Sequence, residues 1–416
     1  MTTQQLTTQL SPAAATPLLT DATRLPVARL LAFTLAGFIA IMTETMPAGL
    51  LPQISLELGV SEALAGQLVS VYALGSVIAA IPIVAATRSW SRRPLFLLAI
   101  GGLLVFNSIT ALSSDYRIIL ASRLVAGMSA GIIWGVLAGY ARRMVPSALQ
   151  GRALAIVGVG QPIALCLGVP LGTWLGGLSD WRGVFWVMSA LSLLLALWVR
   201  CALPDFAGQP AAQRQSIKRI FLMPGIRSVL LVIFLWILAH NVLYTFIAPY
   251  LASVGLGERV DLVLLLFGAA SICGIWLTGV WVDRALRALT LVSLTGFAVA
   301  ALSLGVANDH TWLVLAGIAL WGVTFGGAPT LLQTAIADTA GDGADVAQSM
   351  LVTVFNLAVA MGGVSGGILL QRFGAASFPL ALLVLALAAM LVVWQAGNRG
   401  FRRGHRGDHS LPPAAA

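Results

Sequence analysis

The chain has 416 residues, of which 59% are hydrophobic and only 9% are charged, and its formal net charge is +9. Soluble domains carry about 25% charged residues, so this composition excludes an ordinary soluble protein and predicts an all-α protein that crosses a membrane many times. Cys166, Cys201 and Cys273 stand singly in or beside apolar runs. Because they have no metal-ligand spacing, we interpret them as packed thiols and expect no metal and no cofactor.

Residues 1–26 are rich in Thr, Gln, Ala and Pro and lack the apolar core of a signal peptide, so we expect a flexible cytoplasmic tail. Twelve apolar runs follow, each close to the ~20 residues that span a bilayer. They lie at 27–52, 62–86, 94–113, 117–141, 152–176, 183–203, 227–252, 261–282, 288–307, 311–335, 346–370 and 376–397.

The longest polar connection runs over residues 204–226 and divides the runs into two sets of six. We therefore predict an N-terminal six-helix bundle at 27–203, a cytoplasmic linker at 204–226 and a C-terminal six-helix bundle at 227–397. The remaining residues, 398–416, form a basic cytoplasmic tail. The other connections are short, as expected for antiparallel neighbours.

The basic residues predict the orientation. With both termini inside, the cytoplasmic segments hold 19 of the 24 lysines and arginines, and the outer segments hold four, Arg117, Arg182, Arg259 and Arg372. This asymmetry is the positive-inside pattern. It also explains the positive net charge, so we expect contact with membrane lipids and no nucleic acid.

Glu44 is the one carboxylate well inside a predicted span. A charge at a bilayer centre costs at least ~2.5–3.5 kcal/mol, so such a residue is a functional-site hypothesis by default. Pro47 removes the amide that would bond the Thr43 carbonyl, which predicts a polar kink beside the acid. Glu44 lies ~24 Å from the inner end of its helix, a depth that favours proton access from the outer side. The alternative is an acid that is paired with a basic neighbour or hydrated near the interface.

Two short basic loops occupy the same place in the two sets of six spans. The second is Gly279-Val-Trp-Val-Asp283-Arg284-Ala-Leu-Arg287, and the first contains Thr87, Arg88, Arg92 and Arg93. A duplicated six-helix unit would give this repetition. We predict a gating loop in which charged groups latch adjacent helices, formed by Arg88, Arg92, Asp283, Arg284 and Arg287. The alternative is that the arginines only set the topology.

The pattern Gly279, Asp283, Arg284 and Arg287 is similar to the loop signature of the major facilitator superfamily. The earlier loop departs from it, since Thr87 stands where the acid would be. The resemblance implies twelve transmembrane helices in two pseudo-symmetric six-helix bundles and transport by alternating access.

The fourth and fifth spans extend the resemblance. Arg123, Gly127 and Gly131 look like the family's arginine-and-glycine motif, which is associated with proton transfer; the alternative is a structural arginine held by backbone carbonyls. The fifth span resembles the family's exporter and antiporter motif, whose tight packing would restrict leakage between the halves. Its residues are Gly158, Gly160, Gln161, Pro162, Gly168, Pro170 and Gly172.

The stretch from Thr43 to Pro52 resembles the first helix of bacterial drug:proton antiporters of the sugar-efflux or arabinose-exporter type. The segment from Trp321 to Gln333 and Asn356 also fit that branch. The resemblance covers roughly residues 27–397. It implies a proton-coupled exporter of the bacterial inner membrane, and we expect a monomer.

Polar residues within the spans are candidate lining residues of a substrate cavity. His240 and Tyr244 share a helix face, and His240 is also a candidate second proton site, with a histidine satisfied inside the bundle as the alternative. Trp134 follows Arg123 by about three turns. The predicted cavity residues are Trp134, Gln161, Asn241, Tyr244, Gln333 and Asn356.

The leading hypothesis is secondary active export of a small organic molecule, a sugar, nucleoside or drug, with Glu44, Arg123 and His240 in proton coupling. A phosphate-binding loop needs Gly-x-x-x-x-Gly-Lys, and the single lysine, Lys218, lies between Ile217 and Arg219, which excludes an ATP-driven pump. We expect no enzyme, because the four histidines form no catalytic cluster. An uncoupled facilitator or channel, or an importer of a small metabolite, remains the alternative.

Overall fold

The computed structural model describes residues 25–79, 83, 86–87, 89–146, 149–208, 217–307, 310–397 and 399–404, without the side chains of residues 342 and 345. This part of the chain is helical and contains no strand, which confirms the predicted all-α membrane fold. Ten helical stretches in it are long and apolar enough to cross a membrane, and a pair of helices bent by 112° makes an eleventh when counted as one span.

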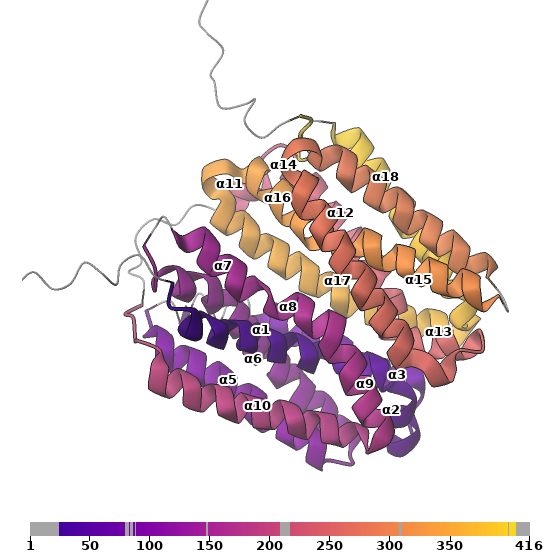
Figure 1. Cartoon of the computed structure of the whole chain (residues 1–416), viewed down its shortest axis with the longest axis horizontal. Helices are drawn as coiled ribbons and strands as arrows, with labels where there is room; N and C mark the ends of the chain where they lie inside the picture. The colour runs from indigo at the N-terminus through magenta and orange to yellow at the C-terminus, as the bar shows by residue number, and fades with distance from the viewer. Residues whose placement is uncertain are drawn as a thin grey trace, which may run out of the picture.

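The first half of the structure runs from α1 to α10 (Figure 1). Three of its helices begin at a capping side chain: Ser61, Asp115 and Asp180 accept hydrogen bonds from the first backbone N–H groups of α3, α6 and α10. The elements are α1 (Val27–Gly49), α2 (Leu51–Leu58), α3 (Glu62–Ile78), α5 (Arg92–Leu112), α6 (Tyr116–Arg142), α7 (Gln150–Gly158), α8 (Gly160–Ile163), a π-helical turn (Ala164–Gly168), α9 (Val169–Leu178) and α10 (Trp181–Ala202).

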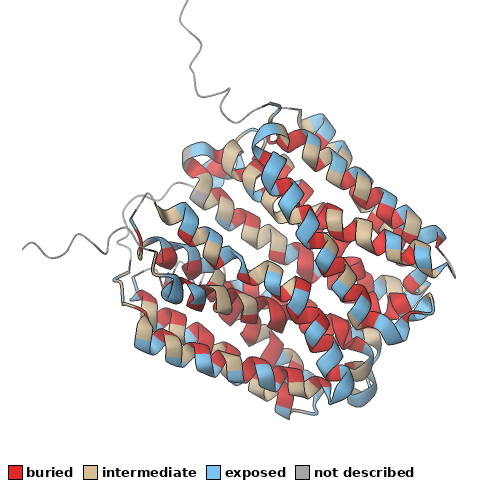
Figure 2. Cartoon of the chain, in the orientation of Figure 1, coloured by how far each residue is buried: buried red, intermediate tan, exposed pale blue. Residues whose placement is uncertain are grey.

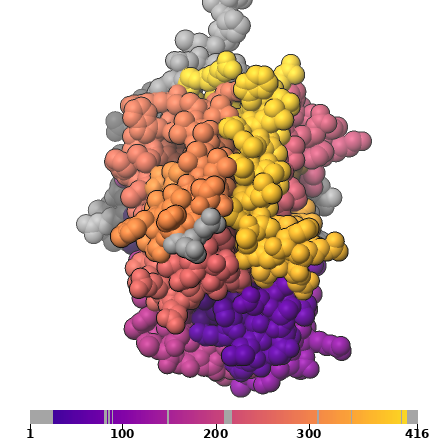
Figure 3. Space-filling view, turned by 90° about the vertical axis from the view of Figure 1, so that its right-hand side faces the viewer, coloured from indigo at the N-terminus to yellow at the C-terminus, as the bar shows by residue number. Residues whose placement is uncertain are grey.

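The second half follows a short helix, α11 (Ile217–Phe221), in the predicted linker. It consists of α12 (Ile226–Thr245), α13 (Ile247–Ser253), α14 (Val260–Val306), α15 (Thr311–Gly326), α16 (Ala328–Ala340), α17 (Ala344–Phe373) and α18 (Phe378–Ala396). In Figure 3 the two halves form two blocks in contact, the first in indigo and magenta below and the second in orange and yellow above.

The long helix α14 contains the predicted eighth and ninth spans. Gly274 approaches the backbone of Val323 in α15, and Gly296 approaches the side chain of Thr324. Along a straight helix these two glycines would lie about 33 Å apart, so the chain must reverse between them to reach neighbouring residues of α15. The reversal is at Ala285, whose φ of −148° and ψ of 42° are not helical. Ala285 lies in the predicted loop between the runs 261–282 and 288–307. The eighth and ninth runs are therefore separate spans, as predicted.

The segment after α10 and the segment after α18 lie at the same end of the bundle. We call this end the basic end. In the first half, the Arg93 side chain donates to the Leu203 carbonyl at 3.3 Å. In the second half, Arg287 donates to the carbonyls of Trp394 (3.0 Å) and Gly397. Residues 399–404 of the predicted tail therefore pack on the bundle, and the Phe401 side chain is fully buried.

The opposite end of the first half is held by a clasp around Glu57. Its carboxylate accepts from Arg182 Nε at 2.8 Å and from the Trp181 indole at 2.5 Å. Arg182 also donates to the backbone carbonyls of Ala111 and Ser113. These bonds join α2, α10 and the end of α5.

The two halves meet along two seams of small residues. In one, α3 packs on α17, and Gln67 Nε2 donates to the Gly363 carbonyl at 3.2 Å, the one side-chain hydrogen bond that joins these two helices in the part described. In the other, Gly268 of α14 lies against the backbone of Cys166. Glycine at these points lets the backbones approach closely.

Figure 2 shows exposed positions, in pale blue, along the peripheral helices, and many of the exposed residues are large and apolar. Val292, Leu380 and Trp276 are between 65% and 68% exposed. A soluble protein rarely exposes such contiguous apolar surface. This face is therefore the lipid-facing surface of a multi-pass membrane protein.

Candidate functional site

Glu44 lies in α1 where the helix is about to break. Its side chain is 7% exposed. Pro47 follows within the helix, and Leu50, with φ −112° and ψ 11°, separates α1 from α2. The helix thus continues through Pro47 and breaks at Leu50, six residues beyond the acid, and not beside Glu44 as predicted.

Arg123 of α6 is fully buried beside Glu44. Its Nε donates to the Leu68 carbonyl of α3, and one terminal nitrogen donates to the backbone carbonyl of Glu44, each at 3.2 Å. The guanidinium lies 4.5 Å from the ring centre of Tyr72 and 5.7 Å from that of Phe185. Backbone carbonyls and aromatic faces thus hold the arginine.

The Glu44 carboxylate and the Arg123 guanidinium interact through space without a direct bond. Among the described residues, the carboxylate makes no hydrogen bond and no ion pair within 4.0 Å, but the two charges are close enough to act on each other electrostatically. The second terminal nitrogen of Arg123 is buried without a protein hydrogen-bond partner. A small movement could therefore join the two groups or separate them.

Further polar groups surround this pair. Tyr72 donates its hydroxyl to the Ala40 carbonyl at 2.9 Å, and the buried Asn107 amide donates to Thr43 Oγ1 at 3.0 Å. Asn107 Oδ1 has no protein partner. We call Glu44, Tyr72, Arg123 and these neighbours the charged site.

Trp134, a predicted cavity residue in α6, faces α1, the helix to which Arg123 also donates a hydrogen bond. Its ring lies against Gly37 of α1, where a Cβ would sit 3.4 Å from the indole. The Arg123 motif also has its predicted packing role, since Gly127 and Gly131 lie against the backbone of Tyr72 and Ser76 in α3. Both features fix α6 between α1 and α3.

An aromatic cluster is centred on His240 in the second half. The His240 ring is parallel to that of Phe325, with centres 3.6 Å apart and planes 3° apart. The ring centres of Tyr244, Trp321 and Phe267 lie 5.0, 5.3 and 5.9 Å from that of His240. We call these five residues the aromatic cluster.

The aromatic cluster contains polar atoms that no protein group satisfies. His240 Nδ1, the Tyr244 hydroxyl and the Trp321 indole nitrogen are buried without a hydrogen-bond partner among the described residues, and so is the nearby Trp236 indole nitrogen. Each such group costs about 1–3 kcal/mol. The indoles can only donate, whereas the hydroxyl and imidazole donate or accept, so the set suits a flat ligand that offers acceptors.

The two sites occupy equivalent positions in the two halves. A shift of 195 residues carries Gly127 and Gly131 onto Gly322 and Gly326, which lie against Phe267 and Ser271 as the first pair lies against Tyr72 and Ser76. Phe246 breaks α12 as Leu50 breaks α1. His240 precedes Phe246 by the six residues that separate Glu44 from Leu50. The fold thus sets a carboxylate and an imidazole in corresponding places.

The four predicted amides lie in four different helices. Asn241 and Asn356 are buried, and each donates to a carbonyl of its own helix at 2.9 Å. Gln161 in α8 is partly buried, whereas Gln333 in α16 is exposed. Asn241 adjoins the aromatic cluster, since it follows His240 in α12.

The predicted gating residues that the structure describes lie at the basic end; Arg88 is outside the described residues. The backbone N–H of Arg92 donates to the Phe206 carbonyl at 2.9 Å, and Arg287 binds the end of α18. Asp283 and Arg284 are exposed. The Arg92 bond thus joins α5 to the segment after α10, and the Arg287 bond joins α14 to α18.

The glycines of the fifth span face α1. Gly168 lies against Met42 and Gly172 against Met46. On its other side the same span meets α14, where Cys166 contacts Gly268. The span is therefore sandwiched between α1 and the second half, as its glycine-rich composition predicts.

The sequence analysis did not predict Tyr72 and Asn107 as site residues. It also did not predict that Trp321 and Phe325 pack on His240. Trp321 and Phe325 are four residues apart, as are His240 and Tyr244, so each pair shares a helix face. This repeated spacing was the pattern in the sequence that could have revealed them. No comparable pattern marks Tyr72 or Asn107, because each acts across helices that are distant in sequence.

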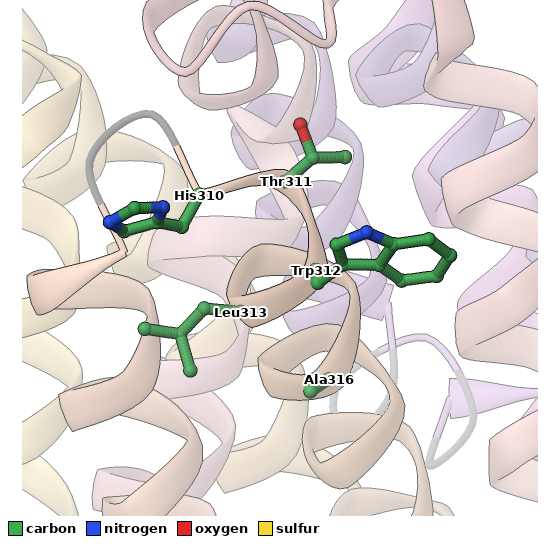
Figure 4. A pocket seen from close by; sticks show the side chains of 5 residues that line it. All are labelled: His310, Thr311, Trp312, Leu313 and Ala316. Carbon is green, nitrogen blue, oxygen red and sulfur yellow. The ribbon is translucent and has the colours of Figure 1, made fainter.

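A hollow lies elsewhere, at the start of α15 (Figure 4). It has a volume of about 630 Å³ and is lined by His310, Thr311, Trp312, Leu313 and Ala316. Trp312 is 85% exposed, so this is an open surface feature and not part of either buried site. Within the part of the chain that the structure describes, no three His, Cys, Asp or Glu residues gather closely enough to hold a metal.

A family model described as the Major Facilitator Superfamily matches residues 33–344. The purine ribonucleoside efflux pump NepI of Escherichia coli K12 is 31% identical over 367 residues, which cover 86% of this chain and 92% of that protein. The NepI of Shigella flexneri is similar to the same extent.

Two solved structures share the fold. A D-xylose–proton symporter aligns with a TM-score of 0.76 at 15% identity, over 91% of this chain and 99% of that one. The human organic anion transporter MFSD10 (TETRAN) aligns with a TM-score of 0.66 at 16% identity, over 89% and 100%. At these identities the likeness concerns the fold alone.

Proposed function

Because the chain belongs to the Major Facilitator Superfamily, we propose that it is a secondary active exporter in which Glu44 couples the outward movement of a small organic molecule to the inward movement of protons. The observation that carries this proposal is the buried Glu44 carboxylate, which has the Arg123 cation as its neighbour but no direct bond to it. An ionisable group inside a span is retained at a cost, which favours a functional role.

The charged site can act as a two-state element. When Glu44 is ionised, it attracts the guanidinium of Arg123, and the buried terminal nitrogen of Arg123 is free to meet it. When a proton neutralises Glu44, Arg123 keeps only its carbonyl and aromatic contacts, so α1 and α6 are less strongly held. Tyr72 is the other titratable group that faces the pair. A change of charge would then bias the packing of α1 against α3 and α6.

We propose that the aromatic cluster contacts the cargo. Stacking faces combined with unsatisfied donors favour an uncharged, flat ring that carries acceptor nitrogens or carbonyls. The name of the NepI relative gives purine ribonucleosides as its cargo, which makes nucleosides the first candidates here. Sugars and drugs remain to be compared with them. The role of His240 as a second proton site stays a prediction beside this one.

Everted membrane vesicles with an acidified lumen test the coupling. Addition of inosine, or of another cargo found by a growth screen with sugars, nucleosides and antibiotics, should release protons from the lumen. Glu44→Gln should abolish that release, because glutamine cannot exchange a proton. Glu62→Gln, at the start of α3, is the matched control and should retain it.

Two outcomes contradict the proposal. Undiminished proton release in folded Glu44→Gln would remove Glu44 from the mechanism. Cargo flux that ignores an uncoupler would instead favour a facilitator or channel, and flux in the opposite direction would favour an importer.

The proposal includes a bacterial inner-membrane location with both termini in the cytoplasm, so that the basic end faces the cytoplasm. The arginines at that end support this orientation by the positive-inside rule. We also propose a monomer as the transporting unit. Labelling of single cysteines introduced into residues 203–208 and 399–404, from each side of sealed vesicles, tests the orientation.

A further inference from the structure

A second hollow lies at the basic end and has a volume of about 290 Å³. Four arginines line it, Arg284, Arg287, Arg402 and Arg403, together with the apolar side chain of Leu291. Two come from the reversal in α14 and two from the segment after α18. The hollow thus forms only where the end of the chain packs back on the bundle.

Internal bonds leave this positive charge incompletely balanced. Arg402 Nε pairs with Asp338 at 2.5 Å, but its second terminal nitrogen is buried without a protein partner. Arg287 is 5% exposed and binds neutral carbonyls at the end of α18. Even if Asp283 and Asp338 are both counted, four arginines retain a net charge of +2. Arg284 and Arg403 are exposed and reach the open side.

We propose that this hollow binds a phosphate oxyanion, supplied by the headgroup of an anionic phospholipid. Guanidinium forks match the geometry of phosphate oxygens. Trp281 and Trp394 beside the hollow are 49% and 68% exposed, as expected of aromatic residues at the level of lipid headgroups. A basic pocket at the membrane surface, with an apolar wall for the glycerol end of a lipid, recognises such headgroups.

The test compares two double variants of the full chain, each of which loses two positive charges. Arg284→Gln/Arg403→Gln removes the exposed arginines of the hollow, and Arg117→Gln/Arg259→Gln removes two exposed arginines at the opposite end. Binding of dioleoylphosphatidylglycerol is measured by native mass spectrometry of the detergent-purified protein, with dioleoylphosphatidylcholine as the neutral lipid. Inorganic phosphate is titrated as a competitor.

We expect the hollow variant to bind phosphatidylglycerol about tenfold or more weakly than the unaltered chain, since each basic residue near a membrane surface adds measurably to anionic-lipid affinity. The opposite-end variant should bind it within twofold. Competition by millimolar phosphate would support the oxyanion site with a soluble source, and its absence would support the lipid as the source. Equal losses in both variants, or no loss in either, would overturn the proposal. This inference is independent of proton coupling, which the vesicle experiment tests separately.

Discussion

The two halves of the protein share a scaffold but differ in chemistry at the equivalent point. In the first half, the space between α1, α3 and α6 holds Glu44, Tyr72 and Arg123. In the second half, the corresponding space holds His240 and Phe267, with Ile318 at the position equivalent to Arg123. The first half has a buried carboxylate beside a cation to which it is not directly bonded, and the second half has the aromatic cluster.

This difference suggests a division of labour. A buried charge responds to protonation, whereas stacked rings respond to the shape and hydrogen-bonding pattern of a ligand. If both acted in one place, cargo would shield the acid from protons. Under the proposed function, separation across the seam at Cys166 and Gly268 would let each half respond to its own ligand.

The largest effect is expected when the first half is made to resemble the second. Arg123→Ile introduces the residue found at the equivalent position 318 and leaves Glu44 without its cation. A nearby cation favours the ionised form of a buried carboxylate, so without it Glu44 should stay protonated and coupled transport should fall about 100-fold. Cargo-driven proton release in everted vesicles measures it. Arg117→Gln, at the start of the same helix, is the control, and near-normal coupling in Arg123→Ile would show that the arginine is only structural.

A smaller effect tests whether the two scaffolds are equivalent. Gly127→Ala and Gly322→Ala each place a Cβ against a backbone carbonyl, that of Tyr72 and that of Phe267 respectively. Each should destabilise the protein by about 1–3 kcal/mol, the usual cost of overpacking. Thermal unfolding in detergent measures this, with Gly101→Ala as the control because nothing lies within 4 Å of its Cβ position. A cost in one variant alone would contradict the equivalence.

The smallest effect concerns the aromatic cluster. Trp321→Phe keeps a ring but removes a buried donor, so the affinity for a nucleoside should fall about tenfold, the value of roughly one hydrogen bond. Proton coupling per molecule transported should not change. Concentration dependence of inosine uptake into everted vesicles measures the affinity, and the lipid-facing Trp276→Phe is the control. If the ratio of protons to cargo changed instead, the two halves would not divide the work as proposed.

The fold was largely predictable from the sequence. The length of each apolar run and the clustering of arginines in the loops can both be recognised from residues that are close together in the chain. The reversal at Ala285 falls between the two runs expected there, and Glu44 stands out as a carboxylate in hydrocarbon. The glycines near Arg123 predicted close packing without identifying its partner. These features depend on residues near one another along the chain.

The composition of the sites was harder to predict. Tyr72 contacts Arg123 because glycines bring α3 and α6 together, and no periodicity within either helix reveals that pairing. Gln333 was expected in a cavity on polarity alone; its side chain in α16 is exposed, and its place in a cavity stays a prediction. Polarity within a span predicts that a group needs a partner, whereas the direction of the side chain depends on how the helices are rotated.

The seam between α3 and α17 has a mechanical consequence. Glycine surfaces and one hydrogen bond from Gln67 join these helices, so sliding or tilting there breaks few directional bonds. Movement of α3 along α17 therefore costs few hydrogen bonds. The Glu57 clasp and the Arg287 bonds each lie within one half, so they keep each half rigid while the contact between the halves changes.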